Sequence, residues 1–151
     1  MIQEPFLKLL QQRFAVKVLD ASIARCERRH GTRLISVHYF VFGDRCLAEP
    51  FDLKAFQDKW LANDYYTTPG YLQWNYYLVM VVSPEAGRAP GFESKRRHIE
   101  QDRFYTRKFV IPSSDLESFL VGGVAVPAKQ AGESADDILE RWIGKLDEAG
   151  L

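Results

Sequence analysis

The side chains best suited to chemistry stand together between residues 93 and 100. Glu93-Ser94-Lys95 matches the E-x-K half of a nuclease signature, in which carboxylates hold Mg²⁺ and a lysine orients the attacking water. That chemistry needs a rigid strand and a second carboxylate close by, whereas Glu93 follows a segment rich in Pro and Gly. A small Mg²⁺-dependent nuclease that uses Glu93 and Lys95 is therefore an alternative interpretation and not the leading one.

The rest of the sequence does not contain enough metal ligands or nucleophiles, at the spacings that metal sites and catalytic sites need, to predict either kind of site. His98 and Glu100 make a pair, whereas a metal site needs more ligands. Cys26 and Cys46 have no second Cys or His at zinc-ligand spacing, so we expect reduced, partly buried thiols. The sequence has no Gly-rich phosphate loop, G-x-S-x-G elbow or Cys/His dyad. We therefore expect no catalytic residue, no metal and no cofactor.

A run of three cations follows Ser94, a residue type that is typical of helix N-caps. Cations in a first helical turn oppose the helix dipole, but together with exposed backbone N–H groups they suit a phosphate or an acidic protein surface. A solvated helix of mixed charge is the alternative. The residues expected to bind a partner or an anion are Lys95, Arg96, Arg97, Arg103, Lys108 and, near the C-terminus, Trp142.

The charges are unevenly distributed along a chain whose net charge is zero. Twenty basic residues balance twenty acidic ones, which excludes a histone-like protein that binds nucleic acid through bulk charge. Residues 88–112 contain seven bases and three acids, while residues 113–151 contain three bases and eight acids. The acidic C-terminal part is therefore expected to fold back on the basic segment or to meet a basic partner.

The composition is that of an ordinary globular protein. Of the 151 residues, 46% are hydrophobic and 13% aromatic, which excludes disordered and collagenous classes and suffices for one core. The longest apolar run, Tyr76–Val82, is far shorter than the roughly 20 residues of a membrane-spanning helix. The N-terminus does not resemble a secretory signal. A cytoplasmic protein without membrane contact is expected.

Hydrophobic periodicity predicts the strands. Alternating apolar residues indicate strands at 14–19 and 33–42, and Gly43-Asp44 predicts a tight turn into a short strand at Arg45–Ala48. Residues 20–30 fit either a helix closed by Gly31 or a second strand that turns at residues 29–31. Residues 73–82 are apolar on both faces, as in a strand at the middle of a sheet, and a further strand is expected at 105–111.

Spacing and capping residues predict the helices. A first helix is expected from Pro5 to about Arg13, and Asp52 is expected to cap a helix with an apolar stripe at Leu53, Phe56 and Trp60. A basic helix is expected at 94–104 and one or two helical turns at 113–120.

These elements predict an α+β fold with an antiparallel or mixed sheet of about four to five strands and helices packed on it. Residues 1–151 are expected to form a single domain. Residues 122–133 are expected to form a flexible tether to a C-terminal helix at 134–149.

Two polar residues in apolar surroundings need partners. In a strand that starts at Tyr105, Arg107 shares a face with Phe109 and would be partly desolvated, so it requires a carboxylate, and Glu100 and Asp102 are nearest in sequence. Asn75, inside the apolar strand, likewise needs hydrogen-bond partners. These polar residues are expected at least to specify the fold.

Two stretches of the sequence together resemble a known family. Trp74-Asn75-Tyr76-Tyr77-Leu78 is followed some twenty residues later by Ile99-Glu100-Gln101-Asp102-Arg103-Phe104-Tyr105-Thr106-Arg107-Lys108-Phe109-Val110. This pattern, W-N-x-Y-L and then an acidic turn before R-K and an apolar strand, resembles the middle components of bacterial ABC-three-component systems, including the small subunit of Lamassu-type antiphage complexes. The resemblance covers about a quarter of the chain. The matching positions are Trp74, Asn75, Tyr77, Glu100, Asp102, Arg107 and Lys108.

The resemblance implies a small non-catalytic subunit that joins an SMC-like ABC ATPase to an effector, often a nuclease, in defence against phage or plasmid DNA. The expected partners are these two subunits, any contact with DNA being indirect. The expected partner surfaces are residues 83–92, the basic segment 94–103 and the helix from Ser134. A stand-alone nucleic-acid-binding domain is a further alternative.

Overall fold

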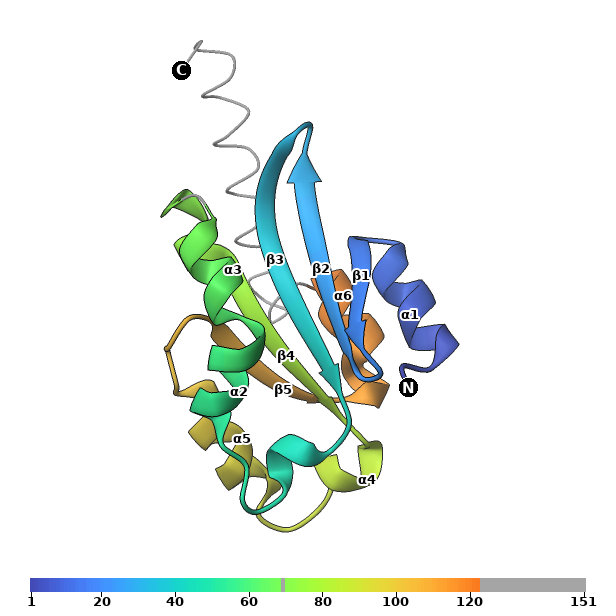
Figure 1. Ribbon diagram of the computed structural model, residues 1–151. Coiled ribbons are helices and arrows are strands. Elements are labelled where there is room, and N and C mark those ends of the chain that lie inside the picture. Colours follow the sequence, from blue (N-terminus) through green and yellow to red (C-terminus); the bar gives the residue numbers. More distant parts are fainter. Residues whose placement is uncertain (69, 123–151) are drawn as a thin grey trace.

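Five strands form one mixed sheet in which successive strands are neighbours, in the order β1-β2-β3-β4-β5. In the computed structural model, which describes residues 1–68 and 70–122, β1 to β3 form an antiparallel meander that β4 and β5 extend in parallel (Figure 1). The strands are β1 (Ala15–Asp20), β2 (Ile23–His30), β3 (Arg33–Phe42), β4 (Tyr76–Val82) and β5 (Arg107–Pro112). The α+β class with a mixed sheet is confirmed.

Helices cover both faces of this sheet. α2, α3 and α5 pack on one face, and α1 and α6 pack on the other, to the left and right of the sheet in Figure 1. The helices are α1 (Glu4–Gln11), α2 (Leu53–Trp60), α3 (Ala62–Thr67), α4 (Pro84–Gly87), α5 (Phe92–Glu100) and α6 (Leu116–Gly122), with short 3₁₀ turns η1 (Arg45–Leu47), η2 (Gly70–Asn75) and η3 (Ser113–Asp115). No helix in the described part of the chain is long and apolar enough to cross a membrane.

β4 is the central strand that its sequence predicts. All seven of its residues are buried, and it pairs with β3 on one side and with β5 on the other. Leu78 belongs to the core under α2 and α5, while Val79 belongs to the core under α1 and α6. A strand that is apolar on both faces is stable only where both faces are covered, because at any other position one apolar face would be exposed to water.

Residues 20–30 adopt the strand alternative. Ile23 packs under the α2–α5 layer and Cys26 under the α1–α6 layer, so the segment alternates between two covered faces. Gly31 at the β2–β3 turn has a φ of 61°, which glycine adopts without steric cost. The turn lies at residues 31–32, later than the predicted 29–31, because Arg29 and His30 still pair with Leu34 and Arg33 of β3.

The predicted strand at Arg45–Ala48 is wrong. This segment contains the 3₁₀ turn η1, and the second neighbour of β3 is the parallel strand β4. Parallel strands need a crossover connection, which here runs through α2 and α3, so the chain must leave the sheet after Gly43. The N–H of Gly43 donates to Val81 O (2.9 Å) as the chain departs.

Other boundaries differ from expectation by a few residues. α2 is capped as predicted, since Asp52 Oδ1 accepts from the N–H of Ala55 (2.9 Å). α5 starts two residues earlier than predicted, and β5 starts two residues later. Gly122 is the last residue of α6. The rest of the predicted tether, residues 123–133, and the predicted helix 134–149 with Trp142 lie outside the described residues.

Asp64 attaches α3 to the sheet. Its carboxylate accepts two hydrogen bonds from the Arg25 guanidinium on β2, from Nε at 2.8 Å and from Nη2 at 3.2 Å, and a third from the Tyr39 hydroxyl on β3. The backbone oxygen of Asp64 accepts from Thr68 Oγ1 (2.9 Å). Because the Asp64 and Arg25 side chains are only 21% and 17% exposed, this bidentate pair is poorly screened by water.

We predict that Asp64→Ala destabilises the protein. The substitution removes the acceptor of the Tyr39 hydroxyl and of two hydrogen bonds from Arg25, which leaves this partly buried cation with Glu27 as its carboxylate partner and costs about 1–3 kcal/mol. Urea denaturation measures the change, and Glu4→Gln, which alters an exposed pair on α1, is the control. Equal urea midpoints for Asp64→Ala and the wild type would contradict this role of Asp64.

Candidate interaction surface

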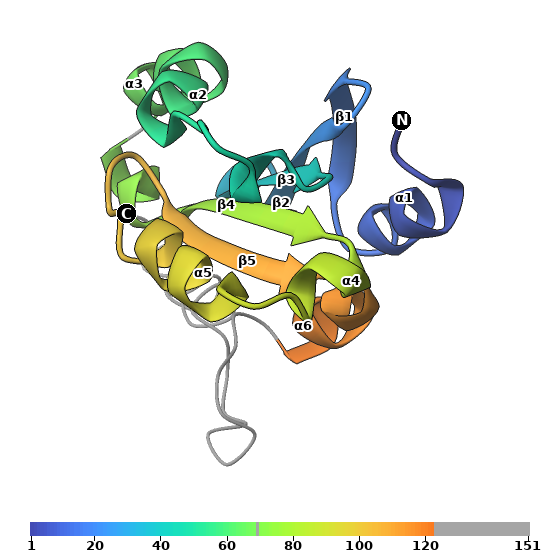
Figure 2. The same ribbon diagram turned by 90° about the horizontal axis from the view of Figure 1, so that it is seen from below.

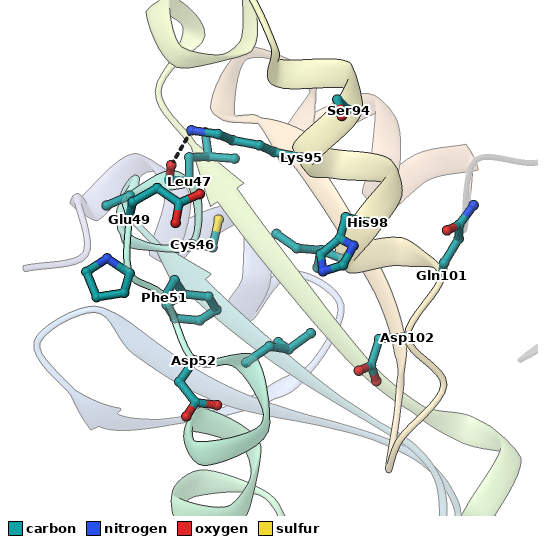
Figure 3. Close-up of a pocket in the computed structure, with 14 residues that line it drawn as sticks. Cys46, Leu47, Glu49, Phe51, Asp52, Ser94, Lys95, His98, Gln101 and Asp102 are labelled. Carbon is teal, nitrogen blue, oxygen red and sulfur yellow. Dashed lines mark hydrogen bonds between the residues drawn. The ribbon is translucent and has the colours of Figure 1, made fainter.

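A cleft of about 810 Å³ separates α5 from the segment that leads into α2 (Figure 3). Lys95, His98 and Asp102 line one side of the cleft, and Glu49 and Asp52 line the other. Lys95 Nζ crosses the cleft and donates to Leu47 O at 2.8 Å, the dashed line in Figure 3. The cleft is therefore polar and carries charges of both signs.

The cations of α5 do not stand in its first turn. Gly91, with a φ of 82°, is the N-cap, so Ser94 is inside the helix and its predicted capping role is wrong. Helix formation starts at Phe92 because this ring is buried in the core under α5, a constraint that the local capping pattern does not reveal. The first turn carries Glu93, which complements the helix dipole.

The three cations of α5 are engaged to different degrees. Arg96 lies 3.6 Å from Glu93 and 3.5 Å from Glu100 in exposed pairs along the helix. Lys95 is bound to Leu47 O, and Arg97 is exposed. Of the three, Arg97 is thus the one most accessible to a partner, while Lys95 and Arg96 could join a contact by exchanging weak surface bonds.

Glu93 and Lys95 do not form the arrangement that E-x-K nuclease chemistry needs. Residues two apart on a helix point in different directions, and here Glu93 contacts Arg96 while Lys95 contacts Leu47. Both residues belong to a helix, whereas the chemistry requires a strand. Among residues 1–68 and 70–122, no three His, Cys, Asp or Glu side chains are grouped so that they could hold a metal ion.

Lys108, and not Arg107, is the buried cation of β5. The Lys108 side chain is fully buried, whereas Arg107 is exposed at the start of the strand. Adjacent residues of a strand point to opposite faces, and α5 packs on the face that Lys108 shares with Val110. The prediction of a desolvated Arg107 with a carboxylate partner is therefore wrong by one residue, and Lys108 is not available as a surface anion contact.

The Lys108 ammonium holds the segment between α5 and β5. Nζ lies 2.9 Å from Asp102 Oδ1 and donates to the backbone oxygens of Asp102 (3.1 Å), Phe104 (2.8 Å) and Thr106 (2.9 Å). Asp102 Oδ1 also accepts from the N–H of Phe104 (2.8 Å). This network accommodates Tyr105, whose φ of 66° is uncommon for a residue other than glycine.

Burial and charge pairing oppose each other at these two groups. Burial lowers the pKa of Lys108, although Asp102 partly restores it. Burial by itself would raise the pKa of Asp102, but hydrogen bonds from Lys108 and from the N–H of Phe104 outweigh it, so this pKa is lowered. Asp102 therefore remains ionised beside the ammonium at neutral pH.

Glu100 protects the outer edge of β5. Its Oε2 accepts from the N–H of Val110 at 2.9 Å, so an edge group that would otherwise be open to another strand is bonded. Two residues further along the same edge, Pro112 has no N–H to offer. Glu100 and Asp102 are thus both bound to β5, the first to its backbone and the second to Lys108.

The two stretches that carry the family resemblance lie side by side in the sheet. Tyr77 of β4 is the register partner of Arg107 on β5, and Leu78 is the partner of Lys108. Asn75 is buried, and its Oδ1 accepts from the Tyr77 hydroxyl at 3.1 Å, which provides the partner that it was expected to need. The side chain of Trp74 lies outside the described part of the chain.

The sequence interpretation missed an aromatic cluster at the end of α3. Tyr65, Tyr66 and Thr68 face Arg103, Phe104 and Tyr105 across a hollow of about 430 Å³. Tyr66 is 69% exposed and Phe104 53% exposed, which is unusual for rings of this size. The sequence does contain two pairs of adjacent aromatic residues, at 65–66 and 104–105. No local sequence pattern, however, indicates that these two pairs are in contact in the fold.

Comparisons with known proteins found no match: no family model, no curated protein and no solved structure is similar to this chain at a significant level.

We predict that Asp102→Asn destabilises the protein by about 1–3 kcal/mol at neutral pH, because Lys108 loses its ionised partner. A carboxyl whose pKa is lowered by folding contributes stability above its ordinary value of 3.8 and loses it as the pH falls through the lower folded value. The gap between wild type and variant should therefore narrow below about pH 4. Urea denaturation at several pH values measures it, and a pH-independent gap would refute the prediction.

We predict that neither cysteine reacts with Ellman's reagent in the native protein. Burial raises the pKa of Cys26 to about 12, and burial followed by the charge of Asp44 raises the pKa of Cys46 to about 11. Near pH 8 the thiolate fraction is therefore very small, and both sulfurs are sheltered. Addition of denaturant should release two equivalents of thiol. Rapid labelling of Cys46, which lines the cleft, would show that the cleft opens in solution.

Proposed function

We propose that this chain is a cytoplasmic, non-catalytic subunit that joins an SMC-like ABC ATPase to an effector in bacterial defence against phage or plasmid DNA. The observation that carries the proposal is the register of β4 and β5. The two halves of the family-like pattern, some twenty residues apart in sequence, are paired residue by residue through Tyr77 with Arg107 and Leu78 with Lys108.

The contacts of the pattern residues give a physical reason for the pattern. Glu100 binds the backbone of Val110, Asp102 binds Lys108, and Asn75 binds Tyr77. Acids must precede the R-K strand because they satisfy its edge and its buried ammonium. The hydrogen bonds of these pattern residues therefore connect β4, α5 and β5, which supports a structural role for the residues rather than a catalytic one.

The surface of α5 suits a partner protein with acidic groups. Arg97 and His98 are exposed on this helix, and the adjacent cleft exposes Lys95 (Figure 2 shows α5 alongside β5). Charges at the rim of an interface accelerate association and select the partner more than they add affinity. Because α5 is held to β5 through Glu100, the basic surface is presented in a fixed orientation.

The test is co-expression with the products of the neighbouring genes, which the proposal predicts to be a coiled-coil ATPase and an effector. We predict a stable complex in size-exclusion chromatography with light scattering. The double variant Lys95→Glu/Arg97→Glu should weaken it at least about tenfold, because charge reversal opposes the acidic partner. Arg13→Glu/Lys17→Glu, at two exposed positions after α1 and on β1, is the charge-matched control.

A chain that elutes alone while the ATPase and effector associate without it would contradict the proposal. So would equal weakening by the α5 variant and the Arg13/Lys17 control, since the contact would then depend on total charge and not on this surface.

A further inference from the structure

We propose that the aromatic hollow between α3 and the segment 103–105 binds single-stranded DNA directly, with bases on Tyr66 and Phe104 and a phosphate on Arg103. This goes beyond the linking role, in which any DNA contact is indirect. The hollow differs from the α5 cleft in its residues and in its charge.

The rings of the hollow are open to a flat ligand. Tyr66 meets Tyr105 at 88° and Phe104 meets Tyr105 at 82°, so neither exposed ring is in a parallel stack with another described ring. Their exposed fractions of 69% and 53% leave surface on which a base can lie. Base stacking on such rings is the usual way in which proteins hold unpaired strands without reading their sequence.

The charge of the hollow favours an anion. Arg103 is the single charged residue of its lining, and no acid in the described residues is bonded to it. Arg103 directly precedes Phe104 in sequence, so a cation for a phosphate lies next to a ring for a base. An acidic peptide would satisfy Arg103 but would not need two open rings, so single-stranded DNA is the better fit.

Both walls of the hollow are fixed in advance. Asp64 holds α3, which carries Tyr65 and Tyr66, to Arg25 and Tyr39. Lys108 holds the backbone of residues 102–106, and the Tyr105 hydroxyl donates to Asp58 Oδ1 at 2.9 Å. A ligand therefore meets rings that are carried on backbone already ordered by folding, which favours binding.

The test is fluorescence anisotropy of a labelled oligo(dT) of about 15 nucleotides with the full 151-residue chain at low salt. Tyr66→Ala and Phe104→Ala should each weaken binding about 5- to 100-fold, while Phe104→Trp should retain it and Phe104→Leu should not. Val18→Ala, an exposed apolar residue on β1, is the matched control. One phosphate contact predicts a slope of log K against log salt of about −0.7, which Arg103→Gln should abolish.

Three results would overturn the proposal. The first is no binding of oligo(dT) at low salt. The second is retention of binding by Phe104→Leu, which would replace stacking by simple apolar contact. The third is that a poly-Glu peptide binds where the oligonucleotide does not, and that Tyr66→Ala and Phe104→Ala weaken this binding. The hollow would then be a binding site for an acidic protein. The assay uses no partner chain, so its failure leaves the linking role to its own test.

Discussion

A single buried ammonium, that of Lys108, organises the segment between α5 and β5. A fully buried lysine is costly unless its charge is met, and here one carboxylate and three backbone oxygens replace its water. Those four acceptors belong to residues 102–106, so satisfying the charge requires this segment to close around Nζ. Its closure places Glu100 against the edge of β5 and turns Tyr105 outward towards α3.

The Arg25–Asp64 pair fixes α3 to strand β2, just as Lys108 fixes residues 102–106 to strand β5. Both pairs connect a strand of the sheet to an element that would otherwise be attached by few contacts. Partly buried ion pairs add little net stability compared with apolar packing, but they allow few alternative geometries. A stiff sheet with two surfaces held at its margin, one basic and one aromatic, is what a subunit that binds other macromolecules requires.

The parts that the sequence predicted are those that local pattern determines. The alternation of β3, the two apolar faces of β4 and the Asp52 cap of α2 depend on neighbours within a few residues. The ambiguity at residues 20–30 arose because Ala24 and Glu27 are good helix formers, and pairing with β1 and β3 decided it. The sequence identified Glu100 and Asp102 as the carboxylates. It could not decide whether Arg107 or Lys108 is buried, because that depends on which face of β5 is covered by α5. The contact between α3 and residues 103–105 also depends on tertiary packing, which no local pattern reveals.

Amide hydrogen exchange in the wild type and in Lys108→Met tests the central claim most directly. The account predicts that the N–H groups of Phe104, Thr106 and Val110, which donate to Asp102, Phe104 and Glu100, are protected in the wild type. In Lys108→Met the first two should lose protection by at least about tenfold while β4 remains protected. Equal protection of residues 102–106 in both proteins, or none in the wild type, would contradict the claim that Lys108 holds this segment.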